Sequence, residues 1–134
     1  MSINFTLKPV GVIHSPFKSI AECPKQGIDT DEIFEIEVFN EYRDCLRGVD
    51  EHEHLIVLYW LHQSDRESKL VSKDSGLKGV FATRSPSRPN PVGLSVVKFL
   101  DIKGNVLKVK GLDAIEGTPL IDIKPYIMEL ERRD

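Results

Sequence analysis

The strongest constraint on the fold is the segment Leu55–Leu61, which reads Leu-Ile-Val-Leu-Tyr-Trp-Leu. The run leaves no polar face, and several of its residues are β-branched or aromatic, which favours a strand. A strand that is apolar on both faces has to be covered on both sides, so we expect it at the centre of a sheet. The run is too short to span a membrane, because a spanning helix needs roughly 18 apolar residues.

Further short strands are predicted on both sides of this segment. Ile33–Phe39 alternates, with Phe34 and Ile36 on one side and glutamates on the other, which is the period of a strand with one wet face. Lys103-Gly104-Asn105 is typical of a hairpin turn. We expect six or seven strands, over Lys8–His14, Ile33–Phe39, Leu55–Leu61, Gly79–Thr83, Gly93–Ile102, Val106–Lys110 and Leu120–Ile123.

Helices take up little of the expected fold. Apolar residues recur at helical spacing from Tyr42 to Val49, and Gly48 stands where a helix would end. Residues 15–32 read as a long loop, and Gln63–Gly76 reads as polar chain with one helical turn at most. This order predicts a mainly β fold, a small β-barrel with one or two short helices, formed by residues 1–134 as a single domain. A doubly wound, Rossmann-like fold is unsupported, because no Gly-x-Gly-x-x-Gly pattern follows a strand.

The composition is that of a soluble globular protein. Hydrophobic residues make up 40% of the chain and charged residues 29%. The N-terminus lacks the succession of charged, apolar and small residues that marks a signal peptide. Cys23 and Cys45 are the only cysteines, which fits a reducing compartment and gives no disulfide framework or zinc site. We therefore expect a cytoplasmic protein.

The charge is unevenly distributed along the chain. The net charge is −3, which argues against a general polyanion binder. Residues 65–90 nevertheless carry six basic and three acidic groups, a local charge of +3 on an otherwise acidic chain. Such a segment can contact RNA at one place, through Lys73, Lys78 and Arg88, or it can be an ordinary polar loop.

The stretch Gly79–Ser95 is the richest in functional residue types. Three prolines within six positions fix the backbone and restrict the residue before each of them, so the loop is stiff without regular structure. Arg84 and Arg88 on a stiff loop would form a preformed clamp for an anionic ligand. A solvent-exposed turn between two strands fits the same residues.

Metal ligation is not expected. His52 and His54 in Glu51-His52-Glu53-His54 would share one face of a strand, but a third ligand such as His62 lies about 26 Å further along. A polar strand entry explains the segment better. No nucleophile motif is present.

Polar groups gather in three further places. His62-Gln63 ends the most apolar strand, where a barrel opens, and can contact a ligand or be an ordinary rim pair. Glu116-Gly117-Thr118-Pro119 and Pro24-Lys25-Gln26-Gly27 are compact turns with exposed polar groups. Each turn alone is a generic loop.

Taken together, these segments resemble one family. The resemblance runs from Gly11 to Tyr126 and includes the TsaA-like family's motifs, whose characterised members are the TrmO-type tRNA methyltransferases. The matching stretches are Gly11-Val-Ile-His-Ser-Pro16, Cys23-Pro-Lys-Gln26, His54-Leu55 leading to His62-Gln63, Gly79–Ser95, Gly117-Thr-Pro119 and Asp122-Ile-Lys-Pro-Tyr126.

The resemblance implies a small β-barrel that binds S-adenosylmethionine and a homodimer with the cofactor near the subunit interface. It also implies N6-methylation of the threonylcarbamoyl-adenosine (A37) beside the tRNA anticodon. A methyltransferase acting on another substrate and a non-catalytic S-adenosylmethionine-binding module stay open as alternatives. The implied cofactor contacts are Pro24, Lys25, Gln26, His62, Gln63, Arg84, Leu94, Glu116, Gly117, Thr118 and Pro119.

Residue chemistry suggests roles within that set. Arg84 or Lys25 can pair with the cofactor's carboxylate, and Leu94 can pack on its adenine. Glu116 can accept hydrogen bonds from ribose hydroxyls or the ammonium, although the family commonly has aspartate there. His62 is the candidate base, from its place at a strand end. Longer relatives carry an additional C-terminal domain; if that domain helps to hold tRNA, we expect this chain to use another surface or a different substrate.

Overall fold

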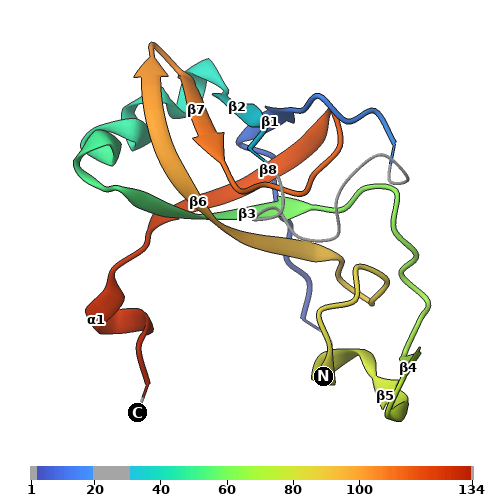
Figure 1. The fold of residues 1–134 in the computed structure, drawn as a ribbon. Coiled ribbons are helices and arrows are strands. Elements are labelled where there is room, and N and C mark those ends of the chain that lie inside the picture. Colours follow the sequence, from blue (N-terminus) through green and yellow to red (C-terminus); the bar gives the residue numbers. More distant parts are fainter. Residues whose placement is uncertain (1–2, 20–30, 134) are drawn as a thin grey trace.

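The fold is a closed six-stranded antiparallel barrel, described for residues 3–19 and 31–133 by a computed structural model (Figure 1). The strands follow one another around the barrel in the order β1-β2-β7-β6-β3-β8. This confirms the predicted small, mainly β, non-Rossmann barrel. The barrel strands are β1 (Gly11–His14), β2 (Ile33–Val38), β3 (His54–Trp60), β6 (Val92–Lys103), β7 (Val106–Lys110) and β8 (Thr118–Pro125).

The apolar run Leu55–Leu61, from which the fold was predicted, supplies part of the barrel core. Leu55, Val57 and Tyr59 of β3 point into the barrel and are at most 2% exposed. β3 pairs with β6 on one side and β8 on the other, so its central place is confirmed. Its outer face is less covered than expected, because Leu58 and Trp60 there are only half-buried.

The long strand β6 closes the barrel by pairing with two neighbouring strands. Its first part, up to Lys98, pairs with β3, and the part from Lys98 onward pairs with β7. The register shifts between Phe99 and Asp101, and such an irregularity bends a strand in the way that barrel closure requires. The predicted hairpin turn is confirmed, and Gly104 in it has a φ of 61°. Glycine adopts this left-handed conformation without steric cost.

The helices are short, as expected. The predicted helix from Tyr42 to Val49 is present as two 3₁₀ helices, η2 (Asn40–Leu46) and η3 (Val49–Glu51), separated at Gly48, whose φ is 88°. The chain closes with α1 (Met128–Glu131). In the described part of the chain, no helix has the length and apolar character needed to cross a membrane.

Two expectations between residues 63 and 83 are wrong. The segment read as polar loop contains β4 (Leu70–Lys73), which pairs with β5 (Gly76–Gly79) in a separate two-stranded sheet. The predicted strand Gly79–Thr83 is instead the 3₁₀ helix η4 (Val80–Ala82), entered at the end of β5. The β4–β5 hairpin projects away from the barrel (Figure 1), so it needs no buried face and lacks the apolar alternation that reveals a strand.

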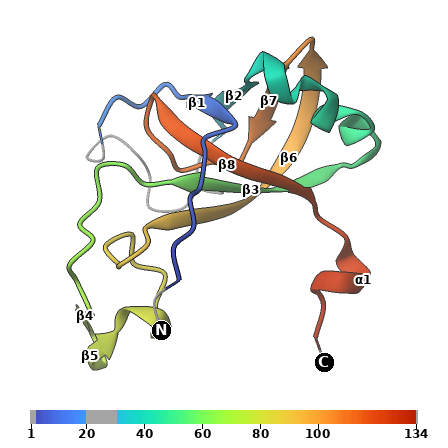
Figure 2. The same ribbon diagram turned by 180° about the vertical axis from the view of Figure 1, so that it is seen from behind.

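Three segments extend from one side of the barrel. Figures 1 and 2 show the N-terminal segment, the β4–β5 hairpin and α1 all projecting below the β3 and β6 strands. All three carry exposed apolar side chains, among them Phe5, Leu77 and Met128.

Candidate functional site

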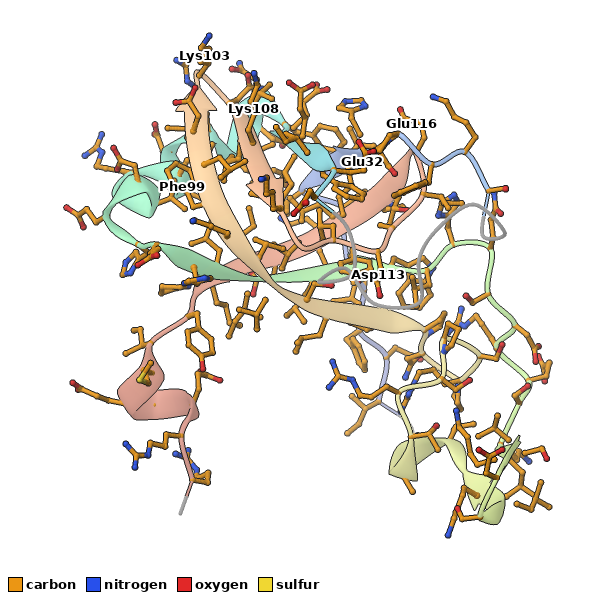
Figure 3. The ribbon with its side chains drawn as sticks, viewed as in Figure 1. Glu32, Phe99, Lys103, Lys108, Asp113 and Glu116 are labelled. Atoms are coloured by element: carbon orange, nitrogen blue, oxygen red, sulfur yellow. The ribbon has the colours of Figure 1, made fainter. Side chains whose placement is uncertain are left out.

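Residues from distant parts of the sequence meet at one end of the barrel. Because neighbouring strands are antiparallel, the ends of β1, β3 and β7 lie together with the starts of β2, β6 and β8. The predicted pair His62-Gln63 follows β3 at this end, and the turn before β8 lies there too. Figure 3 shows Asp113 and Glu116 toward this end and Lys103 at the other. Pro24, Lys25 and Gln26 lie outside the described residues.

The turn Glu116–Pro119 is anchored to β1 by its backbone. The amide of Glu116 donates to the carbonyl of Phe17 at 2.8 Å, and that of Gly117 donates to the carbonyl of Ile13 at 2.9 Å. The buried Thr118 hydroxyl donates to the carbonyl of Ile115 at 2.7 Å. Gly117 itself is exposed, with a φ of 84°, and among the described residues no atom lies within 4 Å of where a Cβ would be.

The Glu116 carboxylate is already engaged within the fold. One oxygen accepts a hydrogen bond from the amide of Ser15 at 2.8 Å, and the other lies 3.0 Å from Nδ1 of His14. Nε2 of His14 lies 2.8 Å from Oε1 of Glu37 on β2, so the imidazole bridges two carboxylates. The predicted contact between Glu116 and the cofactor stays a prediction, and it would have to share this carboxylate with His14.

The electrostatics of this cluster favour a protonated histidine. The hydrogen bond to Glu37, followed by that to Glu116, raises the pKa of His14 from its ordinary value of 6.5. The hydrogen bond from His14 lowers the pKa of Glu116 from 4.5, and the Ser15 amide acts in the same direction. A doubly protonated imidazole donates to both glutamates, which fixes the turn between β1 and β8.

Arg84 and Leu94, two further predicted cofactor residues, lie together on a different side of the barrel. Nη2 of Arg84 donates to the carbonyl of Leu94 at 3.4 Å, and the side chain of Leu94 is 46% exposed. Leu94 lies directly opposite Leu58, on the outer face of β6 and β3. The predicted contacts therefore fall into two groups, one at the β1–β8 rim and one on the β3–β6 outer face.

Asp113 is a candidate functional residue that the sequence reasoning missed. Its Oδ1 accepts hydrogen bonds from the hydroxyl of Tyr59 and, at 3.4 Å, from that of Ser95, and the two hydroxyls lie 2.7 Å apart. Tyr59 is on β3 and Ser95 on β6, so the three side chains join separate segments. The available signal was an acidic residue between the buried Leu112 and Ala114.

The predicted RNA-binding residues lie in or near the projecting hairpin. Lys73 and Lys78 are exposed and share one face of it, because Lys78 lies opposite Val71 and Lys73 opposite Gly76. Nη1 of Arg88 instead donates to the carbonyls of Thr83 and Ser85, at 3.1 and 3.0 Å. Arg88 thus stabilises its own loop, and its contact with RNA stays a prediction.

Two other places bear on what the surface can bind. Within residues 3–19 and 31–133, His, Cys, Asp and Glu side chains form no group of three or more that could hold a metal ion. A hollow of about 300 Å³ lies outside the barrel between β2, β6 and β7, and no predicted cofactor residue that the structure describes lines it. Its lining residues are Glu35, Asp101, Lys103, Val106 and Lys108.

The closed antiparallel barrel defines the chain as a small β-barrel protein rather than a doubly wound one. Comparison with known families gives the particular one: the model of the tRNA-methyltransferase O N-terminal domain matches residues 12–132. The chain belongs to this family, and the expected resemblance is confirmed.

Relatives differ in length and in the names they carry. The chain is 47% identical to an S-adenosyl-L-methionine-binding protein of Archaeoglobus fulgidus, covering 93% of this chain and 91% of that one. It is 54% identical to a probable S-adenosyl-L-methionine-binding protein of the same organism, but spans only 33% of its length. It is 34% identical to the tRNA (adenine(37)-N6)-methyltransferase of Escherichia coli, covering 92% of this chain and 58% of that enzyme.

A solved structure supports the same family assignment. A crystal structure of TrmO from Pseudomonas aeruginosa superposes with a TM-score of 0.82 at 29% sequence identity. The match covers 98% of this chain and 60% of the TrmO chain. The chain therefore spans a little over half the length of TrmO.

Proposed function

We propose that the protein is an S-adenosylmethionine-dependent tRNA methyltransferase that methylates N6 of threonylcarbamoyl-adenosine at position 37. The observation that carries this proposal is the position of two segments assigned to the cofactor, His62-Gln63 and Glu116–Pro119, at one end of the family's barrel. The name of the Escherichia coli relative supports the reaction, and the names of the archaeal relatives support the cofactor.

The residues present suit the chemistry of S-adenosylmethionine, which supplies an activated methyl group when bound. Arg84 offers a guanidinium for its carboxylate, and Leu94 offers an exposed apolar surface for its adenine. His62 and Gln63 add exposed polar side chains at the rim, and Gly117 leaves open space beside its backbone. The chain's task would be to align donor and acceptor and to exclude water.

We further propose that two copies complete the site. The Arg84–Leu94 group lies on an outer sheet face, whereas Glu116 is held against β1 and β2. Outward-facing apolar residues of β3 and β6 pair across the sheet there, and we call them the apolar face: Ile56, Leu58, Trp60, Val92, Leu94 and Val96. A second copy packed on this face would bring its own rim residues toward the Arg84–Leu94 group.

The basic face of the β4–β5 hairpin is the proposed contact with the anticodon arm. Lys73 and Lys78 stand clear of the barrel and are accessible to a phosphate backbone. We place the protein in the cytoplasm, in keeping with a tRNA substrate and a chain with two cysteines.

The test is transfer of labelled methyl from S-adenosylmethionine to tRNA that carries threonylcarbamoyl-adenosine, followed by nucleoside mass analysis. We expect one methyl group on the modified adenosine and none on the same tRNA lacking the threonylcarbamoyl group. Methylation of both tRNAs would contradict the proposed acceptor. Tight cofactor binding without transfer to either tRNA would favour the alternative suggested by the archaeal names, a cofactor-binding module.

A further inference from the structure

The Asp113 carboxylate is held in place from one side only. Its Oδ1 accepts from the hydroxyls of Tyr59 and Ser95, whereas no hydrogen bond to its Oδ2 is formed among the described residues. Tyr59 is 2% exposed, but Asp113 is only half-buried, so the unused oxygen belongs to the more accessible end of the network.

The location of this carboxylate connects the segments that carry the predicted cofactor residues. Tyr59 on β3 lies three positions before His62, and Ser95 directly follows Leu94 on β6. Asp113 itself lies three positions before Glu116. Residues of β3, of β6 and of the loop before β8 therefore meet at this carboxylate, although Leu94, next to Ser95, faces the outside of the barrel.

We infer that Asp113 is a catalytic residue, the general base that accepts the proton of the acceptor nitrogen through Oδ2. The inference rests on the proposed function, since it assumes an N–H acceptor. Asp113 takes the N6 proton as the nitrogen lone pair forms the new N–C bond, while the S–C bond of the methyl donor breaks with its electrons left on sulfur. Because positive charge develops on the nitrogen during attack, its proton becomes acidic enough for a carboxylate to accept.

The rigid hold on Oδ1 suits this role better than the exposed His62 ring does. The two hydroxyl contacts fix the direction of the second carboxylate oxygen. Gly93 allows this, because a Cβ there would lie 2.3 Å from the Tyr59 ring, so only glycine leaves room for the ring that positions the hydroxyl.

The decisive variant is Asp113→Asn, which keeps an acceptor oxygen for Tyr59 but removes the base. We expect single-turnover methyl transfer to fall by roughly 10²–10⁴-fold, with cofactor affinity by calorimetry and melting temperature unchanged. A wild-type rate in this variant would overturn the inference alone. If wild-type protein transfers no methyl group to the modified tRNA, the proposed function and the inference fail together.

A second variant gives a test that holds even if the Asp113→Asn variant does not fold. Tyr59→Phe removes the hydrogen bond that fixes the direction of the Asp113 carboxylate, so single-turnover methyl transfer should fall while cofactor affinity by calorimetry is kept. A wild-type transfer rate in this variant would overturn the inference. Ser95→Ala, which removes the longer contact, should lower the rate by less.

Discussion

The bridge from His14 to Glu37 and Glu116 gives the chain a pH-dependent contribution to stability. Because the pKa of His14 is raised, its contribution is complete below pH 6.5 and is lost as the pH rises through the raised value. Because the pKa of Glu116 is lowered, its contribution is present above pH 4.5 and is lost as the pH falls through the lowered value. The cluster therefore stabilises the turn before β8 most strongly at mildly acidic pH, between the ordinary pKa values of 4.5 and 6.5.

His14→Gln tests this bridge. The three side chains are between 35% and 41% exposed, so solvent screens their attraction. The effect should therefore be modest, a melting temperature lower by about 2–4 °C at pH 6 and a smaller difference at pH 9. Scanning calorimetry across this range measures it, with His52→Gln as the control outside the cluster. An equal loss at both pH values would show that the charge on His14 does not matter.

Gly93 is a second residue whose role follows directly from its surroundings. A Cβ at this position would lie between 2.3 and 2.8 Å from three ring atoms of Tyr59, whose ring is enclosed in the core. Gly93→Ala should therefore lower the free energy of unfolding by about 1–3 kcal/mol through overpacking. Urea unfolding measures the change. Gly79→Ala is the matched control, since nothing lies within 4 Å there, and a loss of similar size in both variants would contradict the steric explanation.

Among the elements, those whose side chains alternate in the core could be predicted from sequence. The residue types of β2 and β3 indicate their burial, and the residues Lys103-Gly104-Asn105 indicate the turn. The β4–β5 hairpin could not be predicted, because it packs on no core that would impose a pattern. Asp113 was missed for another reason: its partners lie 18 and 54 positions away in the sequence, and only the barrel closure brings them together.

The exposed β4–β5 hairpin is the element best suited to contact RNA. If Lys73 and Lys78 pair with phosphates, Lys73→Glu with Lys78→Glu should reduce the slope of log affinity against log salt by about one for each lysine. Cofactor affinity should not change, since neither residue is among the predicted cofactor contacts. Filter binding with modified tRNA at several salt concentrations measures the slope.

Lys103→Glu with Lys108→Glu is the matched control for this experiment. These lysines line the hollow between β2, β6 and β7, and Lys103 ends β6 at the opposite end of the barrel from the predicted cofactor residues (Figure 3). The same loss of slope in both double variants would mean that tRNA is attracted by overall charge rather than by the hairpin.

The apolar face links the assembly of the protein to its proposed site. Val92, Leu94 and Val96 are between 37% and 46% exposed, and they lie opposite Trp60, Leu58 and Ile56 in one continuous pairing. An exposed apolar sheet face of this kind marks an interaction surface. The N-terminal segment, the hairpin and α1, which carry exposed apolar side chains, extend from the same side of the barrel (Figures 1 and 2).

Val96→Asp tests whether that partner is a second copy. A charge at the centre of the apolar face should disrupt a dimer, because burying an unpaired carboxylate is costly. Light scattering should then report a monomer of 15.2 kDa. Cofactor affinity should fall with it, since the proposed site is completed across the interface. Val106 lines the hollow beside two lysines, so Val106→Asp should leave the oligomeric state and the cofactor affinity unchanged. A wild-type monomer with full cofactor affinity would show that one barrel holds the whole site.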